Sequence, residues 1–127
     1  MDPTVAIYKG RYSPNVYQNG IKATRAAFDA GVKLVIGTDR GVNVQEFKNL
    51  PIIDEMEFLV NEAGIPAMDV IKAATINTAE FLKINDNVGS IAVGKKANLL
   101  IVDANPLVDI TNLKKVHSVY KNGKQVD

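Results

Sequence analysis

Apolar and polar positions divide the chain into a helical stretch and a later β-rich stretch. Apolar residues recur at helical spacing in three runs of the first stretch, residues 14–28, 52–63 and 65–82. Ser13-Pro14 is a typical helix start, and Gly31 and Gly64 are placed to end the first two helices. We expect the third helix to break shortly before Thr75 and then continue.

Two β-prone runs flank the first predicted helix, at residues 4–8 and 32–37. Within the second run, Leu34-Val35-Ile36 shows no polar alternation, which is typical of a strand buried on both faces, as in a parallel sheet. Strand, helix and strand together predict a βαβ unit, whose crossover is normally right-handed.

The character of the sequence changes at Asn85, where turn-rich loops begin to separate strand-like runs. The predicted strands cover residues 90–93, 98–103 and 115–120. Asn122-Gly123 is then a strong signal for a tight hairpin that returns into residues 124–126. We therefore predict two parts, an α/β part at residues 1–84 and a small antiparallel β unit at residues 85–127.

A candidate for chemistry stands just after the buried run, in Gly37-Thr38-Asp39. Ligand sites in α/β folds gather at the carboxyl ends of strands, which makes Asp39 a functional candidate. Asp also commonly caps a turn or a helix, and on this stretch alone the two interpretations are equally supported. For Thr75, Asn77 and Thr78, capping and close helix packing are favoured over a catalytic role.

Composition excludes several classes of function. The 127 residues are 46% hydrophobic, enough for a core, and carry a formal net charge of +1, which offers no electrostatic footprint for nucleic acid or an anionic membrane surface. There is no cysteine, no apolar run long enough for a membrane span and no signal-peptide pattern at the start. We therefore expect a cytoplasmic location.

Candidate catalytic groups are few. His117 is the chain's single histidine, and it falls within a predicted strand far in sequence from Asp39. A catalytic metal normally takes three or four ligands, often several of them histidines. The run from Gly89 to Lys96 lacks the spacing of a phosphate-binding loop. By its residues alone, the chain is not expected to hold a catalytic zinc.

The order of four motifs nevertheless resembles one family, the metal-dependent amidohydrolases. AGVKLVIGTD at residues 30–39 is similar to the family's last barrel strand, and residues 62–80 are similar to the region after that strand in the family. Residues 88–106 resemble the return into the family's small β domain, and residues 119–124 its final hairpin. The likeness is strongest to the imidazolonepropionase-like and Xaa-Pro-dipeptidase-like branches.

This resemblance implies an α/β fold: the last one or two βα units of a (β/α)₈ barrel, followed by strands of the family's composite β-sandwich domain. It implies a hydrolase that cleaves carbon–nitrogen bonds of a small amide substrate with water activated by a divalent metal such as zinc. In the family, the aspartate after the last strand meets the metal and moves the proton of the bound water. That role, catalytic and metal-ligating, maps onto Asp39.

Departures from the family pattern shape the remaining expectations. The family's His-x-His, its mid-barrel lysine or glutamate and its later histidines have no counterpart here, and Asn98 stands where the family usually has Asp. We expect an incomplete active site, no metal bound by this chain alone, and either self-association or pairing with a complementary barrel chain, because two parallel strands leave open edges. A non-catalytic module that binds itself or a partner is the alternative.

Overall fold

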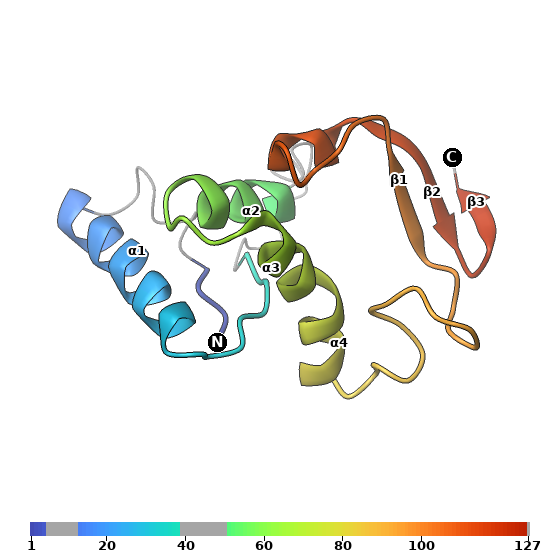
Figure 1. Cartoon of the computed structure of the whole chain (residues 1–127), viewed down its shortest axis with the longest axis horizontal. Coiled ribbons are helices and arrows are strands. Elements are labelled where there is room, and N and C mark those ends of the chain that lie inside the picture. Colours follow the sequence, from blue (N-terminus) through green and yellow to red (C-terminus); the bar gives the residue numbers. More distant parts are fainter. Residues whose placement is uncertain (5–12, 39–50, 127) are drawn as a thin grey trace.

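Helices come first along the chain and strands come last in the computed structural model, which describes residues 1–4, 13–38 and 51–126 (Figure 1). The helical elements are α1 (Pro14–Asp29), α2 (Pro51–Asn61), α3 (Ala67–Lys72), the π-helical turn η3 (Ala73–Asn77), α4 (Thr78–Phe81) and the 3-10 helix η4 (Ile110–Lys114). The strands are β1 (Leu99–Val102), β2 (Val116–Lys121) and β3 (Lys124–Val126). Among the described residues, no helix has the length and apolar content needed to span a bilayer.

Helix α1 begins and ends where the sequence predicts. Pro14 occupies its first turn, although the Ser13 side chain makes no capping hydrogen bond. Gly31 follows the helix with a φ of +77°, a left-handed conformation that glycine adopts without strain. One face of α1 packs against the hydrophobic core through Tyr17, Ile21 and Phe28.

The core lies where α2, α3 and η4 meet the segment that follows α1. Its buried members are Leu34, Met56, Phe58, Leu59, Ala63, Ile65, Val70, Ala73 and Ile110. Leu59 and Val70 are fully buried, so each contributes the full hydrophobic benefit of its side chain, about 1.5–3 kcal/mol. Ile110 brings η4 into the same core, which attaches the β-rich end of the chain to α2.

The third predicted helix does not break before Thr75. Instead, α3, η3 and α4 form one continuous helical run from Ala67 to Phe81, and the backbone stays right-handed helical at Ala73 and Thr78. The middle of the run widens into a π-helical turn, in which hydrogen bonds join residues five apart. The sequence signal taken for a break therefore marks a wider turn.

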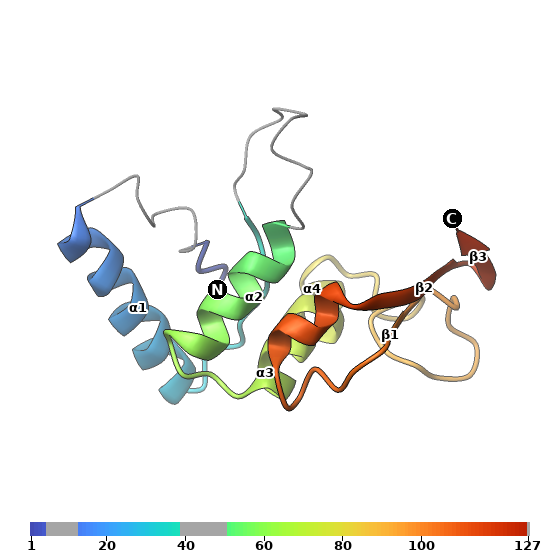
Figure 2. The same cartoon turned by 90° about the horizontal axis from the view of Figure 1, so that it is seen from above.

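The three strands form an antiparallel sheet in the order β1-β2-β3. Leu100 pairs with Val119, which in turn pairs with Val126. The predicted hairpin is confirmed: Asn122 and Gly123 both have positive φ angles, +52° and +78°, as the tightest two-residue turns require. Figure 2 shows the sheet extending away from the helices.

The prediction of a strand at residues 90–93 is wrong. This stretch lies in a loop, with Ile91 and Val93 exposed to solvent. The loop is stabilised by its own contacts, because the Lys95 ammonium donates to the Ser90 hydroxyl at 2.7 Å and the Lys96 amide donates to the Asn87 carbonyl at 2.8 Å. A β-prone run becomes a strand only beside a partner, and the described residues supply none there.

The predicted strand at residues 32–37 is also not formed as a regular strand. Within the described residues, its backbone makes two strand-like hydrogen bonds, both with Met1. Two such bonds are too few to form a regular pair of strands. Of the partner predicted at residues 4–8, only Thr4 lies within the described residues, so the βαβ unit and the barrel fragment stay predictions. The division of the chain at residue 84 likewise stays a prediction.

Candidate functional site

The segment at residues 32–38 leads directly to Asp39, the predicted catalytic and metal-binding residue. Asp39 itself lies outside the described residues. Leu34 and Val35 are buried, with 4% and 7% of their surface exposed, whereas Ile36, Gly37 and Thr38 are half-buried. The middle of the segment is thus buried, and its exposure increases on both sides, towards Val32 and towards Thr38.

On one side, the segment is held by the backbone of Met1. The Met1 amino group donates to the Lys33 carbonyl at 2.8 Å, and the Val35 amide donates to the Met1 carbonyl at 2.9 Å. One residue that bonds on both sides of Leu34 has the pattern of parallel neighbours. The contact has the direction of a parallel pair and involves Met1, whereas most of the predicted partner at residues 4–8 lies outside the described residues.

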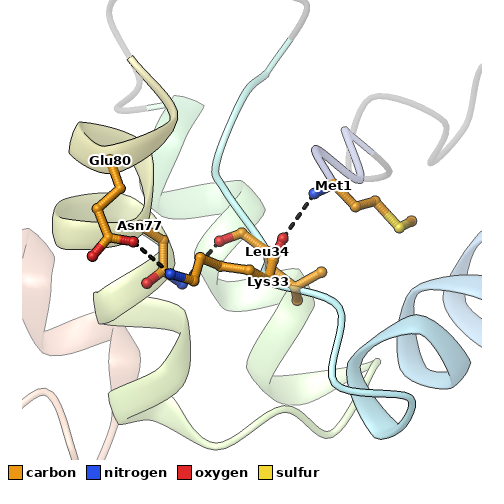
Figure 3. Close-up of polar contacts among 5 residues, drawn as sticks. All are labelled: Met1, Lys33, Leu34, Asn77 and Glu80. Carbon is orange, nitrogen blue, oxygen red and sulfur yellow. Dashed lines mark hydrogen bonds and ion pairs between the residues drawn. The ribbon is translucent and has the colours of Figure 1, made fainter. Parts of the chain in front are cut away.

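On its other side, the segment is held by side chains of the α3–η3–α4 run (Figure 3). The Asn77 side-chain amide donates to the Leu34 carbonyl at 3.0 Å, and the Lys33 ammonium pairs with the Glu80 carboxylate at 2.5 Å. The Ile36 amide donates to the Thr78 hydroxyl at 3.4 Å, a longer and weaker bond. Contacts at Lys33, Leu34 and Ile36 therefore fix the segment against this helical run.

The threonines near the π-helical turn have different partners. The Thr75 hydroxyl donates to the Ile71 carbonyl, one turn back in its own helix, at 2.6 Å. The Thr78 hydroxyl donates to the Ala73 carbonyl at 2.6 Å, and its oxygen remains able to accept the Ile36 amide. Thr75 is exposed and bonds within its own helix, whereas Asn77 and Thr78 contact the segment before Asp39. A mid-helix Asn beside a Thr, both poor helix formers, is the sequence signal that could have suggested this.

Gly37 lies in close contact with the carboxylate of Asp2. A Cβ atom at position 37 would lie 2.0 Å from the Asp2 Oδ2 atom, so a side chain there would displace that carboxylate. The other oxygen of Asp2 accepts a hydrogen bond from the Thr4 hydroxyl at 2.9 Å. One carboxylate thus lies against the glycine two positions before Asp39.

Nothing in the described part of the chain forms a metal site by itself. Those residues contain no group of three or more His, Cys, Asp or Glu side chains placed to hold an ion. His117 lies on β2, where its Nδ1 atom is 2.9 Å from the Asp103 carboxylate, and both side chains are exposed. The described donors do not fit the divalent metal that the resemblance implies.

Two groups with shifted pKa values belong to contacts between structural elements. Burial, together with a 2.6 Å hydrogen bond to Glu62, raises the pKa of the Tyr17 phenol well above its usual value. The pKa of Lys114 is raised by its hydrogen bonds and ion pairs with Glu57 and Asp54, which join η4 to α2. Both shifts report packing between elements rather than preparation for catalysis.

Comparison with known proteins defines the family. The model of the amidohydrolase family matches residues 11–126, nearly the whole chain. The chain therefore belongs to the amidohydrolase family, which confirms the resemblance inferred from its motifs. Hydrolases of this family are generally metal-dependent.

Individual relatives cover most of this chain but little of their own length. An imidazolonepropionase of Fusobacterium nucleatum is 31% identical in an alignment that covers 80% of this chain and 25% of that enzyme. A 5-methylthioadenosine/S-adenosylhomocysteine deaminase of Thermoanaerobacter pseudethanolicus is 36% identical in an alignment that covers 58% of this chain and 18% of that enzyme. The chain spans about a quarter of the length of the first of these curated relatives.

Solved structures give the same proportion. A Xaa-Pro dipeptidase with bound methionine matches with a TM-score of 0.76 and 38% identity, over 88% of this chain and 26% of that structure. The ochratoxinase of A. niger matches with a TM-score of 0.78 and 28% identity, over 98% of this chain and 31% of that structure. The helices and the small sheet are therefore shared with a limited part of larger hydrolases.

Proposed function

We propose that these residues form one part of a metal-dependent amidohydrolase, equivalent to its last one or two βα units and the sheet after them. The observation that carries the proposal is the family match over residues 11–126, combined with coverage of only a quarter of the relatives. In this proposal, Asp39 supplies the catalytic aspartate. The proposal assigns the other metal ligands to residues outside these 127, because the sequence has a single histidine and no His-x-His motif.

The reaction class in this proposal is hydrolysis of a carbon–nitrogen bond in a small amide-type substrate. Two relatives suggest the substrates to try first, the cyclic amide imidazolonepropionate and an Xaa-Pro dipeptide. Activity of the isolated chain is not expected. A complementary segment must supply both the missing ligands and the remaining barrel strands, since a parallel sheet is stable only when its faces and edges are covered.

A chimera tests this proposal. Residues 11–126 replace the equivalent part of the Xaa-Pro dipeptidase, and the product is assayed with zinc on both substrates. We expect hydrolysis by the chimera and its loss, by a factor of a hundred or more, on Asp39→Asn, because general acid–base catalysis contributes roughly 10²–10⁴ in rate. Asp103→Asn is the matched control and is expected to leave the rate unchanged, since Asp103 follows β1 and is an exposed residue beside His117.

Zinc content separates the possible outcomes of this test. Equilibrium dialysis is expected to find stoichiometric zinc in the chimera and none in the isolated 127 residues. A folded chimera that binds zinc but hydrolyses neither substrate, or an Asp39→Asn variant as active as the parent, would contradict the assignment of Asp39.

The alternative is a non-catalytic module that associates with itself or a partner. The specific observation in its favour is a row of three paired apolar side chains across the sheet, Leu100, Val119 and Val126, each 37–48% exposed. Light scattering at micromolar concentration tests it. A metal-free dimer that Leu100→Ser converts to monomer would support the module, whereas a monomer in both cases would contradict it.

A further inference from the structure

The π-helical turn presents two consecutive polar side chains to one stretch of backbone. Asn77 is the last residue of η3 and Thr78 the first of α4, and both are half-buried. Asn77 donates to the Leu34 carbonyl at 3.0 Å, and Thr78 accepts from the Ile36 amide. These contacts bridge 43 and 42 positions of sequence, so they are tertiary contacts and not local caps.

Asn77 and Thr78 are consecutive at the end of the π turn, and their side chains reach two groups on the same edge of the segment, the Leu34 carbonyl and the Ile36 amide. A π turn carries an additional residue, and such turns are frequent at functional sites. Thr78 also donates to the Ala73 carbonyl, five residues earlier, which fixes the orientation of its hydroxyl.

The backbone of the segment is bonded on both of its edges by described residues. Within the described residues, Met1 supplies hydrogen bonds to Lys33 and Val35, whereas Asn77 and Thr78 supply those to Leu34 and Ile36. The Leu34 backbone is buried together with its side chain. If Asn77 were changed, the Leu34 carbonyl would be left without this hydrogen bond, which lowers the stability of the folded state. The exposed pair of Lys33 and Glu80 contributes little by comparison.

We infer that Asn77 and Thr78 are positioning residues that fix the backbone at residues 34–36 and thereby the direction in which the chain approaches Asp39. This inference rests on the proposed function for its catalytic consequence. Neither residue is assigned contact with substrate or metal. Their effect passes through the backbone of Leu34 and Ile36, five and three positions before Asp39.

The first test uses the 127-residue chain and requires no activity. Asn77→Asp keeps the size of the side chain but replaces the donating amide by a carboxylate, and Thr78→Val removes the acceptor for Ile36. Nuclear magnetic resonance is expected to show a displaced carbonyl-carbon signal for Leu34 in the first variant. In the second, the Ile36 amide exchanges with solvent about two- to fivefold faster, because the bond that is lost is longer and weaker than a typical hydrogen bond.

Two further variants make the measurement specific. Thr75→Val removes a hydroxyl that bonds only within its own helix, so exchange at Ile36 is expected to stay as in the parent. Thr78→Ser keeps the hydroxyl and is expected to restore slow exchange. Signals at Leu34 and Ile36 that move no more in Asn77→Asp and Thr78→Val than in Thr75→Val would overturn the inference.

The second test uses the hydrolysing chimera. Asn77→Asp is expected to lower kcat about tenfold or more with KM unchanged, because misplacement of a catalytic group by an ångström costs rate rather than binding. Thr75→Val leaves both constants unchanged. An unaltered kcat in Asn77→Asp would refute the positioning role. An inactive parent chimera would contradict the proposed function alone, since the resonance measurements decide the backbone contact independently.

Discussion

The helices and the sheet of this chain use similar apolar residues but bury them very differently. Leu59 in α2 and Val70 in α3 are fully buried, whereas Leu100 in β1 and Val119 in β2 remain 48% and 37% exposed. The buried residue within the strands is a serine, Ser118. Helices α2, α3 and η4 close a core with the segment after α1, and α1 packs against it. The sheet has one layer, and nothing among the described residues covers its apolar row.

The difference in burial shows that the helical core stabilises the fold, whereas the apolar row of the sheet remains available to a partner. A domain normally buries its apolar faces between two packed layers, and a small sheet is marginal without a second one. The helical part meets that requirement within this chain. The sheet is attached through η4, and its exposed row is the part of the chain that a complementary segment or a second copy would cover.

The largest expected effect comes from comparing two leucines, one in each region. Leu59→Ala removes a fully buried side chain and is expected to lower the free energy of unfolding by about 2–5 kcal/mol. Leu100→Ala removes a half-exposed one and is expected to cost less than about 1 kcal/mol. Urea unfolding followed by circular dichroism measures both. Equal losses would show that the sheet is as well covered as the core.

An intermediate effect is expected where the loop after α4 contacts the helical run. Gly89 has a φ of +92°, and a Cβ atom there would lie 2.6 Å from the Ala79 Cβ and 3.1 Å from the Ile76 Cα. Gly89→Ala is expected to cost about 2 kcal/mol or more, from backbone strain together with this steric clash.

Gly94 provides the control for that substitution. Its φ of +87° imposes the same backbone strain, but nothing lies within 4 Å of the added Cβ. Gly94→Ala should therefore cost only about 1 kcal/mol. If thermal unfolding shows equal losses for the two variants, the contact between the loop and the helical run contributes nothing.

The smallest expected effect lies at the connection between the two regions. Lys114 in η4 pairs with Glu57 and, at 3.4 Å, with Asp54, both in α2. Its side chain is 44% exposed, so solvent screening limits the expected loss for Lys114→Gln to about 0.5 kcal/mol. Lys121→Gln, in β2, is the control and should be neutral.

The pH dependence of this connection has a definite sign. The ion pairs raise the pKa of Lys114 above its ordinary value of 10.5, so folding favours the protonated amine. The stabilisation is complete below pH 10.5 and is lost as the pH rises through the higher folded-state pKa. Parent and Lys114→Gln should therefore converge in stability in strong base. A gap that widens with pH would contradict the ion pairs.

Elements encoded by local signals could be predicted from the sequence, and elements that depend on distant partners could not. Pro14 and Gly31 define α1, and Asn122-Gly123 defines the hairpin, because each acts through its own backbone conformation. Residues 90–93 have the same β-prone character as β1, yet they form a loop. Whether such a run becomes a strand or a loop depends on a partner strand, and the sequence of the run does not show whether a partner lies beside it.

The candidate site divides in the same way. The motif that ends in Asp39 could be identified from its order among four family motifs, although Asp39 lies outside the described residues. Asn77 and Thr78 are unusual residues for a helix interior, but their partners could not be identified from the sequence, because they lie more than 40 positions earlier. Asn98 illustrates a harmless departure: its side-chain oxygen accepts the Asn122 amide at 2.8 Å, and the usual Asp carboxylate could do the same.

The π-helical turn also determines where this helix can change in length. Five residues of a π turn cover about the same rotation as four residues of an α turn, so loss of one residue between Ala73 and Asn77 would return the run to ordinary α-helical winding and leave Thr78 and Glu80 on nearly the same face. Loss of one residue elsewhere in the run would instead rotate everything after it by about 100°. In comparisons among relatives, a one-residue gap is therefore expected at this turn rather than beside it.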